Sequence, residues 1–250
     1  MLTYLKVTIM INNICNICGF GKTYQPENLE SSGMFLDAGF PKERKNAKCP
    51  NCNSLERHRS VFEILKKHKL LYGKLLHIAP ERCFVNAFKN FEVEHILANL
   101  TAKNPSQISI DLEKINLKDC SVDGILAIHV LEHVFNDEIA LNEIFRILKP
   151  GGWALLPVPI MRKFDTIEDR KLTLKYAENP NNEKIKKELQ ARYGHPEHVR
   201  AYGPDFYNKL CKHFDFITID NMFIYMGAKK RNESRYSGEQ FFIARKNPKR

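Results

Sequence analysis

The 250-residue sequence has no long hydrophobic run and no pattern typical of a secreted protein. No apolar stretch reaches the roughly 18 residues that a helix needs to cross a bilayer. The first residues are mildly apolar, but they lack a charged start and a small-residue cleavage site, so we do not predict a signal peptide. The seven cysteines are an odd number, which argues against a disulfide framework. These absences favour a cytoplasmic protein with no membrane span.

Acidic residues are fewer than basic ones, with 29 Asp and Glu against 39 Lys and Arg, and the formal net charge is +10. An excess of this sign favours an anionic partner such as phosphate, nucleic acid or an acidic sugar. The stretches AKKRNESR and ARKNPKR near the C-terminus are clearly basic, but the excess does not form one tract. A solvated surface is the simpler explanation for any single cluster.

Four of the cysteines form two CxxC pairs, Cys15 with Cys18 and Cys49 with Cys52. Two such pairs supply a closed tetrahedral set of thiolates for zinc, and an all-cysteine set leaves no position for water. The residue after each pair, Gly19 or Asn53, tolerates the positive φ that such turns often need. We therefore predict a structural zinc site. The alternatives are chance pairing and two reduced redox motifs.

The other three cysteines lie in apolar patterns and are predicted to be small core residues: Cys83, Cys120 and Cys211. A helix is predicted to follow Cys52, with Asn53 or Ser54 as its cap. In its first turn the sequence Arg-His-Arg, residues 57–59, suits either an anion site or a solvated surface.

From residue 74 the sequence alternates between strand and helix patterns. Strands are predicted at residues 74–79, 94–100, 107–112, 121–131 and 151–160. A helix is predicted from Pro80, and another from Asn136 that ends at Lys149, Pro150 and Gly151. This alternation predicts a parallel sheet with helices on both faces, and ligands in that architecture bind at the carboxyl ends of the strands.

The C-terminal part departs from simple alternation. A helix is predicted at residues 203–214, followed by strands at 216–226 and 239–246 that suit an antiparallel pair at one sheet edge. The polar segment 161–202 has helical character at residues 183–193. Because it interrupts the alternation, we predict that it covers the strand ends as a lid or substrate element.

The turn after the first strand has no glycine between Leu75 and Glu81, although many α/β enzymes place a glycine-rich nucleotide loop there. Ala79 and Pro80 occupy the turn instead. A modified cofactor loop, a lost one, and a turn that only packs strand against helix are all compatible with this stretch.

The segment SVDGILAIHVLEHVFNDEIALNEIFRILKPGG, residues 121–152, resembles the middle of class I S-adenosylmethionine (SAM)-dependent methyltransferases. The phrases CPNCNSLERHR, LLHIAPE and HVRAYG resemble a bacterial subgroup with an N-terminal cysteine cluster. The resemblance implies an α/β Rossmann-like methyltransferase fold, with a mostly parallel seven-stranded sheet and a small zinc ribbon-like module. It implies a zinc-binding module at residues 1–54 and a methyltransferase domain at 55–250, with 161–202 as the insertion.

By this resemblance, the turn at the end of the first strand is a modified cofactor loop. His77 stands where the family has an acidic residue, Ala79 at its first glycine and Glu81 at its second. Pro80 fixes φ between them. Glu81 is expected to pair with the methionyl ammonium of SAM. The amides of the following helix are expected to face the methionyl carboxylate of SAM.

The resemblance also assigns residues at the next two strand ends. Asn99 is expected to hydrogen-bond the ribose hydroxyls, although the family usually has an acidic residue there. Asp111 is expected to accept from the adenine amino group, with the Leu112 backbone nearby. Capping of the next helix is the alternative for Asp111.

The fourth strand ends at Ile128 and His129, which by resemblance lie against the sulfonium and the incoming nucleophile. His129 is a candidate base, although in-line methyl transfer depends mainly on positioning. For His133 we favour a cap or structural role. Glu132 and His133 also match the place where some related quinone-pathway methyltransferases bind a divalent cation.

The stretch GHPEHVRAYG, residues 194–203, carries four functional side chains: His195, His198, Arg200 and Tyr202. We expect Arg200 to hold an anionic group of the substrate, His198 to act as a base, and His195 and Tyr202 to contact substrate. The alternative is a structurally pinned loop in which Arg200 pairs with a carboxylate.

The sequence thus predicts a SAM-dependent methyltransferase with structural zinc that acts on a polar or anionic small molecule or glycan. An RNA methyltransferase is the first alternative, although the cysteine region lacks a basic stripe interleaved with aromatics. A non-catalytic binding protein that has lost the cofactor is the second, supported by the glycine-free turn and Asn99.

Overall fold

The computed structural model describes residues 14–21, 27–30, 42–161, 163–220 and 241–249. The basic stretch at 228–235 and the predicted strand beyond Asp220 lie outside these residues. Among the helices it describes, none combines the length and apolarity required to cross a membrane.

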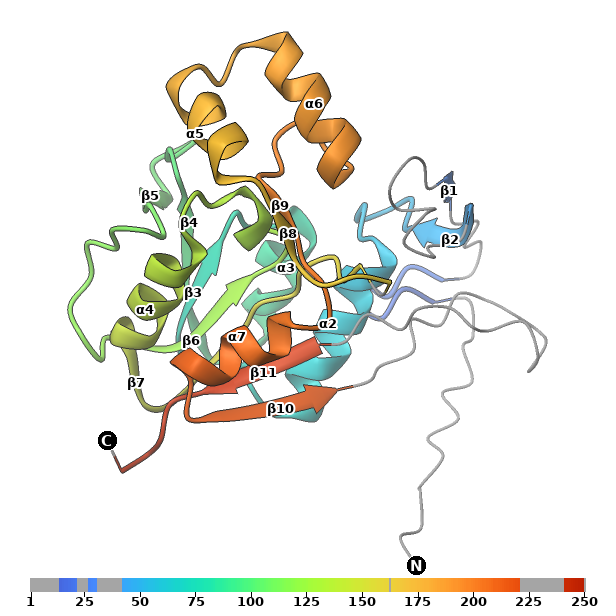
Figure 1. Cartoon of the computed structure of the whole chain (residues 1–250). Helices are drawn as coiled ribbons and strands as arrows, with labels where there is room; N and C mark the ends of the chain where they lie inside the picture. The colour runs from blue at the N-terminus through green and yellow to red at the C-terminus, as the bar shows by residue number, and fades with distance from the viewer. Residues whose placement is uncertain (1–13, 22–26, 31–41, 162, 221–240, 250) are drawn as a thin grey trace, which may run out of the picture.

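The core of the fold is a seven-stranded sheet with the order β10-β11-β7-β6-β3-β4-β5 (Figure 1). Strands β3 to β7 run parallel, as the alternating sequence predicted, so the predicted Rossmann-like fold class is confirmed. The bounds of these strands are β3 Gly73–Ile78, β4 Val93–Asn99, β5 Gln107–Ser109, β6 Val122–Ala127 and β7 Leu148–Leu155.

Two C-terminal strands complete the sheet, β10 at Phe216–Asp220 and β11 at Phe241–Arg245. Strand β11 pairs antiparallel with both β7 and β10, which places β10 at the edge. The predicted antiparallel pair at one edge is therefore confirmed for its described residues.

The register brings several strand ends to one edge of the sheet. Ile78 of β3 is paired with Ala98 of β4 on one side and with Ala127 of β6 on the other. The chain moves outward from β3 to β4 and β5, and then crosses to β6 on the opposite side. The strand order therefore reverses between β3 and β6, and in open α/β sheets ligands bind beyond the carboxyl ends at such a point.

Helices cover both faces of the sheet because strand residues alternate between two hydrophobic cores. Leu76 and Ile125 belong to the core under α4 and α7, whereas Leu75 and Leu126 belong to the core under α2 and α3. Trp153 lies in the second core, where its indole ring fills the space beside Gly124, and a Cβ added there would lie 2.4 Å from the ring. The helices are α2 Glu56–Lys67, α3 Arg82–Ala87, α4 Asp137–Ile147 and α7 Phe206–His213, with the 3₁₀ turns η1 Phe88–Asn90 and η2 Leu131–His133.

Some predicted boundaries and environments were wrong. Helix α4 ends at Ile147, and Lys149 and Pro150 already belong to β7. The helix predicted from Pro80 begins two residues later, and Leu55 rather than Asn53 or Ser54 precedes α2. Of the three cysteines predicted to be core residues, Cys83 is buried, whereas Cys120 and Cys211 are exposed.

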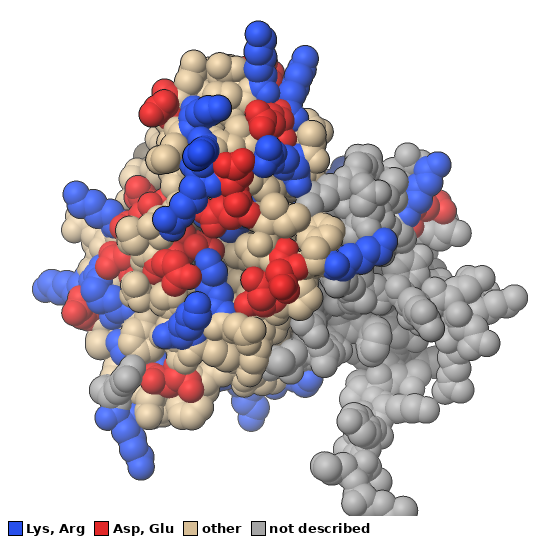
Figure 2. Space-filling model, viewed as in Figure 1, with Lys and Arg blue, Asp and Glu red and all other residues tan. Residues whose placement is uncertain are grey.

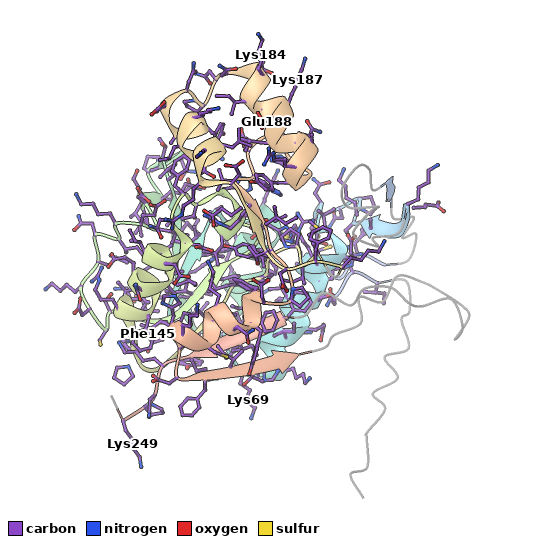
Figure 3. All side chains as sticks on the ribbon, viewed as in Figure 1. Lys69, Phe145, Lys184, Lys187, Glu188 and Lys249 are labelled. Carbon is purple, nitrogen blue, oxygen red and sulfur yellow. The ribbon has the colours of Figure 1, made fainter. Side chains whose placement is uncertain are left out.

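The insertion between β7 and α7 forms a lobe with its own small core, at the top of Figure 1. Its helices α5 and α6 pack together, and Leu189 and Tyr193 of α6 are fully buried between them and the following loop. Lys184, Lys187 and Glu188 project outward from α6 (Figure 3). The elements are β8 Ile167–Glu168, α5 Arg170–Glu178, α6 Glu183–Tyr193 and β9 Arg200–Ala201.

The N-terminal region carries a small antiparallel sheet of β1, Glu27–Glu30, and β2, Glu43–Lys48. It is tied to α2 by hydrogen bonds. The side chain of Asn16 donates to the Arg59 carbonyl at 3.0 Å, and the Arg59 guanidinium donates to the carbonyls of Ala47 and Ser54. Arg59 thus joins the two parts of the protein rather than forming an open anion site.

Candidate functional site

The glycine-free turn keeps a backbone conformation that glycine would favour. Ala79 has φ +49°, in the left-handed region, and its N–H donates to the Ala98 carbonyl at 2.8 Å. This conformation costs a residue with a Cβ roughly 1–2 kcal/mol. Ala79 occupies the position where the resemblance places the first glycine, so the turn retains the shape of the loop without its usual residue.

Glu81 lies between two histidines. Its Oε2 is 2.8 Å from Nε2 of the fully buried His77, and its Oε1 is 3.7 Å from Nε2 of His58. His77 continues through Nδ1 to His95 at 3.0 Å. Burial, with the nearby charge of Arg57, lowers the pKa of His58 to about 2, so His58 is neutral at pH 7.

The tautomer of His58 follows from its other contact. Nδ1 of His58 accepts a hydrogen bond from the Leu55 N–H at 3.1 Å, so Nε2 carries the proton and directs it toward Glu81. Glu81 is therefore held by the hydrogen bond to His77 of β3, with His58 of α2 nearby but beyond hydrogen-bond distance. The following helix α3 has only six residues, so its contribution to binding an anion is smaller than predicted.

Asn99 and Asp111 lie at the same edge, but their side chains make local contacts. The amide of Asn99 donates to Oε1 of Gln107 at 2.8 Å. Oδ1 of the exposed Asp111 accepts from the Glu113 N–H at 2.9 Å within a turn, and no helix follows before β6, so the helix-capping alternative is not met. Leu112 and Ile128 are buried in the two cores, so only their backbones are placed to contact a ligand.

At the end of β6, two histidines converge on one buried carboxylate. Nδ1 of His129 lies 3.3 Å from Oε1 of Glu132, and Nε2 of His198 lies 4.0 Å from the same oxygen. Glu132 is only 1% exposed. Burial would raise the pKa of Glu132, but contact with His129 and the nearby His198 lowers it. His129 also has a left-handed φ of +54°, and strained residues of this kind cluster at functional sites.

Three histidines form a second feature beside Glu132. One ring nitrogen from each of His133, His195 and His198 lies within 4.8 Å of the others. The rings of His133 and His198 meet edge to face with centroids 4.7 Å apart. Burial lowers the pKa of His198 to about 4. The structure thus brings together two parts of the chain that are about sixty residues apart.

Arg200 and Tyr202 do not occupy the positions expected of substrate-binding residues. Both are fully buried. Arg200 donates to the carbonyls of Leu131, Val134 and Phe135 and lies 3.4 Å from Oε1 of Glu168. The hydroxyl of Tyr202 donates to Asp137 Oδ2 at 2.7 Å. Their donors are directed at the protein itself, which matches the pinned-loop alternative.

The four cysteines of the CxxC pairs converge, with all four Sγ atoms within 4.8 Å of one another. Cys15 and Cys52 are 3.7 Å apart, and Cys18 and Cys49 are 3.8 Å apart. The residues after the two pairs have φ +71° at Gly19 and +58° at Asn53, as predicted. A tetrahedral zinc ion fits this donor set.

Sequence reasoning missed the residues that hold the candidate groups. Glu132 pairs with His129, three residues before it, and not with His133 as the resemblance implied. His58 is buried and is not part of a solvated Arg-His-Arg surface. Its burial follows from the apolar spacing of α2, where Val61, Phe62 and Leu65 are buried, and this signal was available. Nothing in the sequence pointed to His95.

A family model described as a methyltransferase domain matches residues 85–156. The matched segment is similar to this family. It runs from α3 through β7 and includes β6 with His129 at its end. The predicted enzyme class, a SAM-dependent methyltransferase, is confirmed, and the acceptor is not determined by the match. Comparison with curated proteins finds no match.

Several solved structures resemble the methyltransferase domain in fold. The YcgJ protein of Bacillus subtilis is 17% identical, with 65% of this chain and 70% of that chain covered and a TM-score of 0.48. A 1,6-didemethyltoxoflavin N1-methyltransferase of Burkholderia thailandensis, solved with S-adenosylhomocysteine, is 14% identical, with 76% and 77% covered and a TM-score of 0.49. At these identities the likeness says nothing about the substrate of this protein.

Proposed function

We propose that the protein transfers a methyl group from SAM to a polar or anionic small molecule or a glycan-type acceptor. One observation carries the proposal: the segment that matches the methyltransferase model supplies β6, and β6 ends beside the glycine-free turn of β3 at the point where the strand order reverses. The candidate residues thus come from neighbouring strand ends.

In this proposal the cofactor lies along the carboxyl edge of β3, β4 and β5. Glu81 pairs with the ammonium, and its hydrogen bond with His77 fixes the carboxylate in advance. Asn99 hydrogen-bonds the ribose through its amide, and Asp111 with the Leu112 backbone holds the adenine. Ala79 and Pro80 form the wall of the turn, with His77 beneath them.

SAM supplies an electrophilic methyl group when it is bound. We propose that His129 removes the proton of the attacking hydroxyl or amine, with Glu132 orienting its ring as a buried carboxylate does in other His–carboxylate pairs. His198 is the second candidate base, because it faces the same carboxylate. The Val199 N–H donates to the Glu132 carbonyl at 2.9 Å, so the insertion is attached at this place and is suited to exclude water.

For the acceptor, we propose that His195 and the insertion provide the contacting surface, and that Arg200 and Tyr202 position the loop. An RNA acceptor is less favoured, because Lys and Arg intermingle with Asp and Glu on the face shown in Figure 2 rather than forming a stripe. We further propose a zinc module at residues 1–54, a methyltransferase domain at 55–250 with its insertion at 161–202, and a cytoplasmic location.

Calorimetric titration with SAM and with S-adenosylhomocysteine tests the proposal. We expect binding by the wild-type protein and binding at least about 10-fold weaker in Glu81→Gln, since a hydrogen bond to a charged group contributes about 1.5–3 kcal/mol. Glu178→Gln, an exposed change of the same chemistry on α5, is the matched control and should leave the affinity unchanged. Absence of binding by the folded wild-type protein at millimolar SAM would support the non-catalytic alternative instead.

A further inference from the structure

The cofactor scheme above does not use the cluster of His133, His195 and His198 as a unit, although it names His195 as an acceptor contact and His198 as the second candidate base. His133 follows β6 in the turn η2, whereas His195 and His198 belong to the loop after α6. The three nitrogens lie within 4.8 Å of one another. Nitrogens that share one tetrahedral ion with bonds of about 2.0–2.1 Å lie about 3.3 Å apart. Binding of one ion would require the side chains of the two loop histidines to rotate by this difference.

Hydrogen bonds to the backbone orient two of the rings. Nδ1 of His133 lies 3.1 Å from the carbonyl of Glu197, and Nδ1 of His198 lies 3.2 Å from the carbonyl of Tyr193. A carbonyl only accepts, so in both rings Nδ1 carries the proton and Nε2 keeps the lone pair. Metal-bound histidines are usually held in this way. Nδ1 of His195 accepts from the Glu197 N–H at 3.2 Å, so this ring must turn or exchange that contact to join them.

Glu132 provides an independent observation. Its side chain is enclosed by the protein, and its oxygens make no hydrogen bond of good geometry among the described residues, although His129 Nδ1 lies 3.3 Å from Oε1. Its Oε1 lies 4.0 Å from Nε2 of His198, the nitrogen that keeps the lone pair. A buried carboxylate needs a compensating cation or a set of hydrogen bonds. A cation held by the histidines would lie next to it.

We propose that His133, His195 and His198 bind one divalent transition-metal ion, with zinc as the expected ion, and that Glu132 balances its charge. Imidazole ligands suit zinc and its neighbours rather than magnesium or calcium. Three protein ligands leave a position open, which is the pattern of catalytic rather than closed structural sites. The open position suits an anionic oxygen or a hydroxyl group of a ligand.

This site would join the insertion to the end of β6, because its ligands come from both. The site differs from the four-cysteine cluster in its donors and its place in the fold, and it does not depend on methyl transfer. As a ligand, His198 could not also act as a base. Metal binding and proton transfer are therefore alternatives for this residue, and metal content separates them.

The test is metal content and ligand type in the purified full-length protein. After equilibrium dialysis with excess Zn²⁺ and removal of loose metal, we expect two zinc ions per chain. X-ray absorption should show nitrogen at about 2.0–2.1 Å beside sulfur at about 2.3 Å. His195→Ala and His198→Ala should each retain one zinc ion and lose the histidine nitrogen signal. The zinc affinity of the histidine site should fall by more than the roughly 10–100-fold that loss of an outer contact causes.

Matched controls make the result specific. His68→Ala, at the end of α2, should retain both ions. Circular dichroism establishes that each variant is folded; His195 is only partly buried, so its substitution remains informative if His198→Ala unfolds. One zinc ion per wild-type chain with sulfur ligands only, or two ions retained by both histidine variants, would overturn the proposal. SAM titration of the same samples separately reports on the proposed function.

Discussion

Two residues at the strand ends beside the proposed site carry left-handed backbone conformations. Ala79 after β3 and His129 after β6 both lie in the left-handed region, on neighbouring strands. Residues other than glycine reach this region only when surrounding structure requires it. The strain at Ala79 is therefore best explained by the shape of the turn and not by the side chain, which is a single exposed methyl group.

Substitution of Ala79 by glycine tests this explanation. Glycine removes the clash of the Cβ but increases the freedom of the unfolded chain, so we expect Ala79→Gly to be neutral or stabilising by up to about 1 kcal/mol. Ala127→Gly, in the buried strand β6, is the control and should destabilise by about 1 kcal/mol. Urea denaturation measures both. A clear loss of stability in Ala79→Gly would show that its methyl group contributes packing.

Arg200 provides a second residue-scale prediction. Because its guanidinium is fully buried and donates to three carbonyls, removal of its charge in Arg200→Met should destabilise the protein by about 3–5 kcal/mol. Arg192→Met, which breaks a solvent-screened pair with Asp169, should lower the free energy of unfolding far less. The measurement is again urea denaturation.

A substrate-binding role for Arg200 would give a different result. The stability of Arg200→Met would then be close to wild type, and only the KM for an acceptor would rise. That pattern would restore the interpretation drawn from the loop sequence.

At the scale of elements, the polar chain from His58 through Glu81 to His77 connects α2 with the β3–α3 turn. The folded-state pKa of His58 is about 2, below its unfolded value near 6.5, so between these values the unfolded chain binds more protons. Protonation therefore favours the unfolded chain, and the free energy of unfolding falls as the pH drops below about 6.5. His58 alone should reduce the free energy of unfolding by about 2 kcal/mol between pH 7 and pH 5.

Replacing His58 by phenylalanine should remove that part of the pH dependence, whatever its effect on stability at pH 7. The measurement is the difference in unfolding free energy between pH 7 and pH 5, obtained from urea curves. His68→Phe, a histidine-to-phenylalanine change at the end of the same helix, is the matched control. An unaltered difference in His58→Phe would mean that other groups dominate this pH range.

Much of the element order was predictable from the sequence because hydrophobic periodicity records which strand faces are buried. The boundary between α4 and β7 was not predictable. Lys149-Pro150-Gly151 is a stop signal for a helix, but it does not indicate that the strand already begins at Leu148. The convergence of His129 and His198 on Glu132 was also not predictable. It depends on how the insertion folds back, and a polar loop carries no periodicity that fixes this path.

At the scale of the whole molecule, two appended parts meet the sheet at different places (Figure 1). The cysteine module packs on α2, where Ile17 and Cys52 contact the core under that helix. The insertion is attached to the segment after β6 through Val199 and Arg200. The module is therefore placed to support α2, whereas the insertion is placed beside the end of β6.

The separation of the module from the sheet gives the last prediction. Structural zinc contributes about 10–16 kcal/mol to small zinc modules, so Cys18→Ser should lose one zinc ion and unfold this region. Hydrogen exchange should then rise in residues 14–21 and 42–54, while the amides of β3, β6 and β7 stay protected, because their cores contain few module residues. Cys211→Ser, at an exposed cysteine, is the control and should change neither zinc content nor exchange. Exchange that rises throughout the sheet in Cys18→Ser would show that the two parts fold as one unit, contrary to a boundary near residue 54.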